Sequence, residues 1–207
     1  IGIALEALSR DDYPPEQTKE FLKISKLELE RLNLLVDRVL RLSMFEEREP
    51  NIYLESVDMS QVVQQVLDAV KLRTEKISAD ISLRLTTDAS WMVHGDRLHL
   101  TSVVFNLIDN ALKYVKGTPQ IKITLSAKDQ KVILQVADNG IGIPAEFQEK
   151  IFEKFFRVPA EMGVKANGHG LGLSYVAKVI QQHGGTIRVD SGQGQGSVFT
   201  IELPREK

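Results

Sequence analysis

The chain contains no cysteine, which excludes disulfide bridges and thiolate metal sites and is compatible with a reducing compartment. No apolar run is long enough to span a bilayer, and no signal peptide is visible. The formal net charge is only -2, so there is no excess of positive charge for binding nucleic acid or an anionic membrane. From these absences we expect a cytoplasmic region that binds no nucleic acid and carries no membrane segment.

The sequence also lacks an initiating methionine, because it begins with Ile1. We therefore expect a piece of a longer protein, whose missing N-terminal part could carry a membrane anchor. The 207 residues are 43% hydrophobic and 26% charged, which is ordinary for globular proteins. This length suits one sizeable domain with a smaller appendage.

The appendage is expected to be helical and to occupy residues 1–50. Pro14 and Pro15 interrupt a short helical pattern, and a longer pattern runs over residues 16–47. Its apolar residues recur at spacings of three and four and form one narrow stripe: Leu32, Leu35, Val36, Val39 and Leu42. A long helix with such a stripe needs a partner, so we predict part of a dimerisation hairpin, with an ordinary packing helix as the alternative.

After Pro50 the pattern changes to alternating strands and helices, which predicts an α/β domain over residues 51–207. Strands are expected at residues 52–57, 81–85, 91–94, 121–125, 132–137, 186–190 and 198–203. One helix is expected to begin at Asp58 or Ser60, and others to cover residues 97–116 and 171–183, with a short helix and its exit at 146–156. The core side of the helix at 97–116 is expected to carry Val104, Leu107, Ala111 and Val115, and the buried stripe of the last helix Leu173, Val176, Ala177 and Ile180. His183, at the end of the last helix, is expected to be a partner for the helix dipole.

Asp138 follows the expected strand at 132–137 and precedes Gly140 and Gly142. Glycines allow a sharp turn and a close approach of the backbone to a ligand. An ionised carboxylate only accepts hydrogen bonds, so Asp138 would select an amino group over a carbonyl, as recognition of adenine requires. The alternative is an ordinary glycine turn after a strand.

The helix at 97–116 carries Asn106, Asn110 and Lys113 at spacings of four and three, which places them on one face. Amide oxygens are suitable ligands for Mg²⁺, and a lysine meets phosphate oxygens as a point charge. The alternative is a solvated helix face. An amide at position 106 cannot act as a general base toward water, which argues against ATP hydrolysis.

Two further clusters could contact phosphates. The alternating glycines of Gly168-His169-Gly170-Leu171-Gly172-Leu173 open the last helix, where exposed backbone N–H groups favour anions. His169 either touches a phosphate or is a tolerated loop residue. Phe152-Glu153-Lys154-Phe155-Phe156-Arg157 combines three aromatic residues with two cations, and Lys154 and Arg157 could reach phosphates when a loop closes. A surface helix end would explain those charges equally well.

Taken together, these segments resemble the sensor histidine kinases of two-component signalling. "NLIDNALKY" is similar to the N box, "DNGIGIP" to the G1 box, "FEKFFR" to the F box, "GHGLGLS" to the G2 box and "GSVFTIELP" to the closing strand motif. The five motifs occur in the family's order over residues 52–204. The resemblance implies an α+β fold, a two-layer α/β sandwich in which a mixed sheet is covered by helices on one face, preceded by a helical hairpin.

The resemblance also implies roles for individual residues. Asn110 would hold Mg²⁺ with help from Asn106, and Asp138 would bind the adenine amine. The residues expected to act in catalysis are Asn106, Lys113, Lys154 and Arg157. The residues expected to bind ATP are Asn106, Asn110, Lys113, Tyr114, Asp138, Gly140, Gly142, Ile143, Phe155, His169, Gly170, Leu171, Gly172 and Leu173.

The implied function is transfer of the γ-phosphoryl group of ATP to a histidine of the dimerisation domain, for relay to an aspartate of a response regulator. The family's acceptor histidine is expected to be missing, because no histidine precedes His94. The implied partners are ATP, a response regulator and a second copy of the chain, paired through the N-terminal helices. The alternative functions are an ATP-hydrolysing member of the same superfamily and a nucleotide-gated dimer module without kinase activity.

Overall fold

The computed structural model describes residues 52–86, 90–159 and 170–206. The chain divides into two units, Ile1–Pro50 and Asn51–Lys207, and all described residues belong to the second. The helical hairpin predicted at residues 1–50 lies outside the described residues and stays a prediction, as does His169 of the predicted site.

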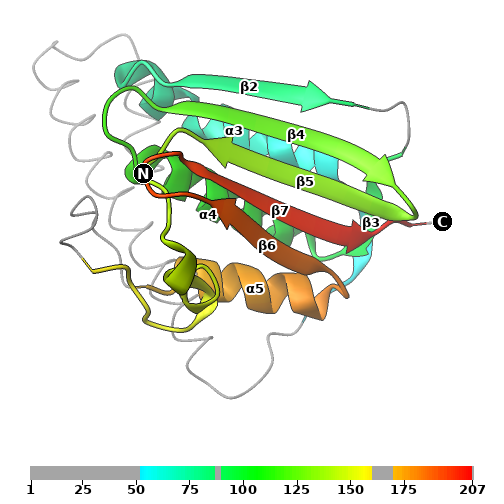
Figure 1. The fold of residues 1–207 in the computed structure, drawn as a ribbon. Helices are drawn as coiled ribbons and strands as arrows, with labels where there is room; N and C mark the ends of the chain where they lie inside the picture. Colours follow the sequence, from blue (N-terminus) through cyan, green and yellow to red (C-terminus); the bar gives the residue numbers. More distant parts are fainter. Residues whose placement is uncertain (1–51, 87–89, 160–169, 207) are drawn as a thin grey trace, which may run out of the picture. The chain divides into compact units, whose positions relative to one another are not determined.

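The centre of the described unit is a mixed five-stranded sheet (Figure 1). Its strands lie in the order β2 (Asp80–Leu85), β4 (Gln120–Lys128), β5 (Lys131–Asp138), β7 (Ser197–Pro204) and β6 (Thr186–Ser191). β2 pairs with β4 in parallel, and the other neighbours are antiparallel. Asp129 and Gln130 join β4 to β5, and both have positive φ, as in the two-residue turns that match the twist of a hairpin.

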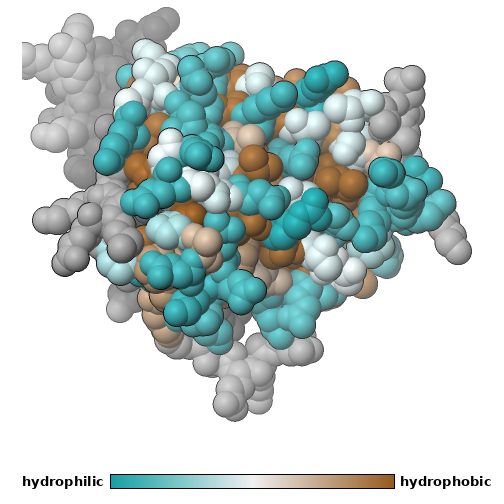
Figure 2. Space-filling view, in the orientation of Figure 1, coloured by the Kyte–Doolittle hydropathy of each residue, from teal (hydrophilic) through white to brown (hydrophobic). Residues whose placement is uncertain are grey.

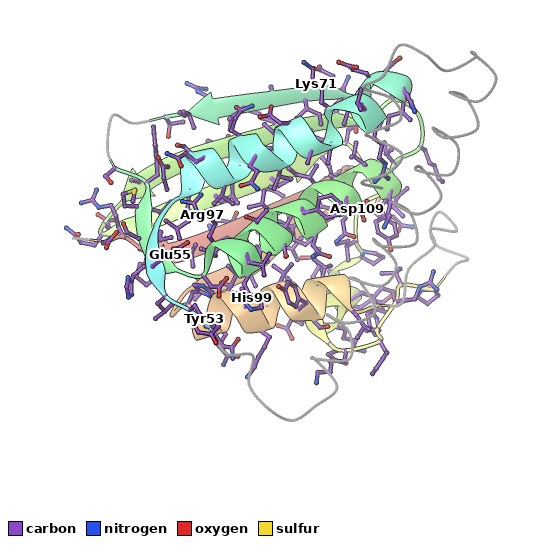
Figure 3. The ribbon with its side chains drawn as sticks, turned by 180° about the vertical axis from the view of Figure 1, so that it is seen from behind. Tyr53, Glu55, Lys71, Arg97, His99 and Asp109 are labelled. Carbon is purple, nitrogen blue, oxygen red and sulfur yellow. The ribbon has the colours of Figure 1, made fainter. Side chains whose placement is uncertain are left out.

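Three helices cover one face of this sheet, namely α3 (Met59–Lys76), α4 (Arg97–Lys113) and α5 (Gly172–Gln182). Figure 3, which views the molecule from the helix side, shows α4 between α3 and α5. The opposite face of the sheet is mainly hydrophilic, with scattered hydrophobic side chains (Figure 2). Alternation along the strands explains the difference, because Ile121, Ile123 and Leu125 are buried while Lys122 is exposed. The predicted two-layer α/β sandwich is confirmed.

A second, two-stranded antiparallel sheet pairs β1 (Glu55–Asp58) with β3 (Met92–Gly95). β1 begins three residues later than expected and ends at Asp58, immediately before α3 starts. The Asp58 side chain caps α3 by accepting a hydrogen bond from Ser60 N at 2.8 Å.

Two predicted helices are shorter in the structure. α4 ends at Lys113 rather than at 116, because the Tyr114 carbonyl leaves the helical direction and accepts from Ile141 N at 2.9 Å. Residues 146–156, expected as a short helix and its exit, form only two single 3₁₀ turns, Ala145–Phe147 and Lys150–Phe152. The backbone is already extended at Glu153, and the Gln148 side chain donates to the distant Ser191 carbonyl at 2.7 Å, so contacts with the rest of the fold replace a continuous helix.

The start of α4 is joined to the end of α5 through Asp96 and His183. The Asp96 carboxylate accepts from His99 N and from Tyr53 N, each at 3.0 Å, and Asp96 N donates to His183 Nε2 at 2.9 Å. Burial alone would raise the pKa of Asp96, but the two amide donors overcome it and the pKa lies below its ordinary value.

His183 is therefore not the charged dipole partner that its position suggested. Its Nδ1 lies 2.7 Å from the Val179 carbonyl, so this nitrogen carries the proton and Nε2 accepts from Asp96 N. The side chain is buried, and burial lowers its pKa. A neutral imidazole thus links two helices in the core.

We expect the stability of the chain to fall as the pH is lowered from about 7.5 to about 5.5. Because folding lowers the pKa of His183, the unfolded chain binds more protons in this range, and protonation favours unfolding. The variant His183→Gln, whose amide oxygen can accept the Asp96 N–H, should show a flatter dependence. Thermal melting across this pH range measures both, and equal slopes would contradict the neutral role of His183.

Candidate nucleotide-binding site

The second half of α4 carries the predicted polar face. Asn106, Asn110 and Lys113 are partly exposed, whereas Val104, Leu107 and Ala111 of the predicted core side are buried. Val115, also predicted for the core side, lies beyond the end of α4 and is partly exposed. Asn106 Nδ2 donates to the Ser102 carbonyl at 2.8 Å. The amide is held in one orientation by this bond, and its Oδ1 atom remains available as a ligand.

The G2 segment lies directly against this oxygen. A Cβ atom placed on Gly172 would lie 2.8 Å from Asn106 Oδ1, closer than side chains approach. Gly172 starts α5, and no side chain caps this helix end. The first N–H groups of α5 are thus presented close to the amides of α4, which is the arrangement that helix N-termini use for phosphate.

Burial along α5 differs from the prediction at two positions. The buried side chains are Ser174, Tyr175, Val176, Val179 and Ile180. Leu173 and Ala177, which were predicted to lie in the buried stripe, are partly exposed. The core-facing stripe is thus centred about one position earlier along the helix than expected, and Leu173 remains accessible beside the uncapped helix start.

Asp138 ends β5 and is half-buried. Its Oδ1 atom accepts from Gly140 N at 2.8 Å and from Ser197 N at 3.2 Å, and the described residues place no donor on Oδ2. Burial raises the pKa of Asp138, and the two amide donors offset only part of this effect. One carboxylate oxygen is therefore fixed by the backbone and the other can accept from a ligand.

The loop after Asp138 touches the end of α4. Ile141 N donates to the Tyr114 carbonyl at 2.9 Å, and a Cβ atom on Gly140 would meet the same oxygen at 2.5 Å. Gly140 is therefore required for this close approach. The structure brings the N-box and G1 residues together at the C-terminal end of α4.

The turn formed by Gly192, Gly194 and Gly196 supports the same loop from the other side. In the structure Gly194 N donates to the Ile141 carbonyl at 2.7 Å. Gly142 has a φ of 70°, and it lies so close to the Gly192 carbonyl that a Cβ atom at this position would overlap the oxygen.

The F-box segment contacts the start of the G2 segment. Phe155 N donates to the Gly170 carbonyl at 2.8 Å. Both residues have positive φ, 66° for Phe155 and 70° for Gly170, and for a phenylalanine this is a strained conformation of the kind found at functional sites. Lys154 and Arg157 lie on this segment and are exposed, and His169 lies outside the described residues.

Sequence reasoning assigned no role to two residues that shape the site. Asn139 Oδ1 accepts from Gln120 N at 2.8 Å and its Nδ2 donates to the Thr118 carbonyl at 3.0 Å, which fixes the chain after Tyr114. Asp109 forms an ion pair with Lys113. The signal for Asp109 was present in the sequence, because an acid four residues before a lysine pairs with it on a helix.

The family of this chain is shown by its similarity to known proteins. Residues 95–207 match the family described as histidine kinase-, DNA gyrase B-, and HSP90-like ATPases. The chain belongs to this family. The predicted relationship to sensor histidine kinases is confirmed by its relatives and by solved structures, and the family's common ligand is ATP.

Sensor protein RprX of Bacteroides fragilis is 34% identical over 209 residues, which cover 99% of this chain and 40% of the relative. Sensor-like histidine kinase SenX3 of Mycobacterium tuberculosis is 33% identical over 206 residues, covering 99% of this chain and 49% of the relative. The chain thus spans about half or less of the length of these relatives.

Two solved structures have the same architecture. A mycobacterial sensor histidine kinase, MprB, superposes with a TM-score of 0.65 at 32% identity, covering 75% of this chain and all of that one. Histidine kinase ThkA, in complex with response regulator protein TrrA, gives a TM-score of 0.65 at 28% identity, covering 99% of this chain and 56% of that chain. Both support the two-layer assignment.

We expect Asp138→Asn to lose nucleotide affinity without losing stability. The asparagine oxygen can still accept from Gly140 N and Ser197 N. Its NH₂ group, however, would face the adenine amine, and two hydrogen-bond donors cannot bond to each other. Affinity for an ATP analogue should fall by roughly tenfold or more, the value of one hydrogen bond to a charged group. Titration calorimetry measures this loss.

The stability of Asp138→Asn provides the control. Because folding raises the pKa of Asp138, the ionised carboxylate disfavours the folded state at pH values above that pKa. The neutral variant should melt at or above the temperature of the parent protein near pH 7. Unchanged nucleotide affinity, or weaker binding that accompanies a lower melting temperature, would contradict the assignment.

We expect Gly172→Ala to weaken binding of ATP analogues but not of adenosine. The new methyl group would displace Asn106 Oδ1, whereas alanine favours the helix itself. A loss of about tenfold, or about 1.4 kcal/mol, is expected for the triphosphate. An equal loss for adenosine would place Gly172 near the base instead.

Proposed function

We propose that this chain is the ATP-binding catalytic region of a sensor histidine kinase, acting within a longer protein. The observation that carries the proposal is the convergence of the N-box, G1 and G2 residues around the second half of α4. Contacts of Tyr114 with the G1 loop and of Asn106 with Gly172 support it. The relatives and solved structures that carry the name histidine kinase support it independently.

The adenine end of the site lies at Asp138. Its Oδ2 atom would accept from the exocyclic amine, with Gly140, Gly142 and Ile143 forming the wall of the base pocket. Tyr114 would flank the nucleotide at the end of α4. This half of the site selects adenine because its carboxylate accepts a hydrogen bond from the exocyclic amine, whereas the guanine carbonyl at that position has no hydrogen to donate.

The phosphate end lies between α4 and the start of α5. Lys113 would contact phosphate oxygens as a point charge, and the N–H groups of the uncapped helix start would bind others. The backbone of this start comprises Gly170, Leu171, Gly172 and Leu173. Phe155, Lys154, Arg157 and His169 would join these contacts when the segments around α5 close over the ligand.

The donor set fits Mg²⁺. The described residues contain no group of three or more histidine or acidic side chains placed to hold a metal ion, so a site made by carboxylates alone is not offered there. Asn110 would bind Mg²⁺ through its amide oxygen with Asn106 Oδ1 assisting, and phosphates and water would complete the oxygen shell. When bound, the ion neutralises charge on the transferring phosphates.

In the proposed reaction an imidazole nitrogen attacks the γ-phosphorus, a P–N bond forms, and the bond to the bridging oxygen breaks to release ADP. The chain's residues act by positioning and charge neutralisation. Asn106 cannot take a proton from water, which disfavours hydrolysis. The acceptor histidine would come from a segment outside these 207 residues, because no histidine precedes His94.

The partners in this proposal are a response regulator, which receives the phosphoryl group on an aspartate, and a second copy of the chain paired through residues 1–50. The solved complex of ThkA with TrrA supports a regulator as partner. No helix in the described ranges is long and apolar enough to cross a membrane. We place the reaction in the cytoplasm, with any membrane anchor in the rest of the protein.

Phosphoryl transfer in trans tests the proposal. The chain is incubated with Mg²⁺, γ-labelled ATP and a dimerisation hairpin from a relative that contains an acceptor histidine. We expect acid-labile phosphohistidine on the hairpin, and a loss of at least about tenfold in rate with Asn110→Ala, which removes the proposed metal ligand.

The alternatives give different outcomes in this assay. Steady phosphate release without labelled hairpin would identify an ATP-hydrolysing protein. Tight ATP binding with neither product would identify a nucleotide-gated module. Either result, obtained with a hairpin that its own kinase can phosphorylate, would contradict the kinase proposal.

A further inference from the structure

Lys113 is part of a three-residue charge cluster that reaches from α4 to α3. Asp109 Oδ1 accepts from Arg73 Nη1 at 2.7 Å, and Asp109 Oδ2 pairs with Lys113 Nζ. The Asp109 side chain is only 15% exposed, against 46% for Arg73 and 36% for Lys113. A largely buried carboxylate therefore depends on two more exposed cations from two helices.

The position of Lys113 around α4 gives this cluster a connection to the ligand site. At roughly 100° per residue, Lys113 lies about 40° from Asp109 on one side and about 20° from Asn106 on the other. On the helix surface Lys113 thus lies between Asp109, to which its ammonium group is bonded, and the asparagines of the proposed metal and phosphate site. Figure 3 shows Asp109 near the end of α4 that lies away from Arg97 and His99.

We infer that Arg73 sets the strength with which Lys113 binds nucleotide phosphates, by neutralising Asp109, the carboxylate that competes for the same ammonium group. The inference rests on the proposed function, in which Lys113 contacts phosphate. Asp109 and a phosphate oxygen are both anions, so each weakens the other's hold on Lys113. A guanidinium on Asp109 reduces that competition and shields the phosphates from its negative charge.

Arg73 is thus a positioning residue that acts at the phosphate site without touching it. It lies in the last turn of α3, and its described partner is Asp109. Phosphate oxygens compete with Asp109 for the Lys113 ammonium group, whereas the adenosine part of the ligand does not. ATP affinity should therefore respond to the cluster, while adenosine affinity should not.

The experiment is a titration of the 207-residue chain with a non-hydrolysable ATP analogue and Mg²⁺, and separately with adenosine. Arg73→Ala should weaken binding of the analogue by about two- to fivefold, as expected for partly exposed ion pairs. Asp109→Asn should tighten it by a similar factor. In the double variant the loss of Arg73 should have no further effect, because the carboxylate through which it acts is gone.

Arg97→Ala is the matched control. Arg97 lies at the other end of α4, is 41% exposed and pairs with Glu55 at 3.5 Å, so its removal changes the net charge equally. Its effect on the analogue should be negligible. The inference is overturned if Arg73→Ala changes affinity no more than Arg97→Ala, if the effect of Arg73→Ala persists without Asp109, or if Asp109→Asn weakens binding.

Two further measurements separate this inference from the proposed function and from folding defects. Lys113→Met should weaken binding of the analogue, and in this background Arg73→Ala should no longer change the affinity. If the parent chain binds no analogue, or Lys113→Met binds it unchanged, the proposed phosphate site is wrong. If Lys113→Met weakens binding while Arg73→Ala matches Arg97→Ala, only the present inference fails. Adenosine affinity and melting temperature establish that each variant is folded.

Discussion

The hydrogen bond from Ile141 N to the Tyr114 carbonyl is the contact on which the rest of the site depends. It joins the end of the helix that carries the asparagines to the loop that carries Asp138. The two segments are separated by a complete β-hairpin in the sequence, and β4 and β5 return the chain to this point. Asn139 and the Gly192–Gly196 turn hold the loop in place from either side, so the ligand-facing groups are supported by backbone contacts.

Asp96, which is buried, and Asp138, which is half-buried, differ in how many of their oxygens accept backbone amides. Both oxygens of Asp96 accept backbone amides, and its pKa is lowered although burial acts in the opposite direction. Only one oxygen of Asp138 is used in this way among the described residues, and burial raises its pKa. A carboxylate with one oxygen left without a backbone donor is therefore harder to ionise than the fully bonded carboxylate that caps α4.

Much of this organisation was predictable from sequence because the signals are local. Periodicity located the strands and the three helices, and the acid followed by spaced glycines identified the loop after β5. The early end of α4 was not predictable, since it depends on a bond from Tyr114 to a residue far along the chain. The missing helix at 146–156 and the neutral state of His183 likewise reflect tertiary surroundings. Motif order could indicate a shared site, but the contact of Gly172 with Asn106 required three dimensions.

The bond between Tyr53 N and Asp96 has a structural consequence. Tyr53 precedes β1, so the incoming polypeptide is bonded to the carboxylate that caps α4 before it enters the strand. That helix carries the amides and the lysine toward its opposite end. The point where the chain enters the domain and the proposed ligand site are therefore joined by the two ends of a single helix.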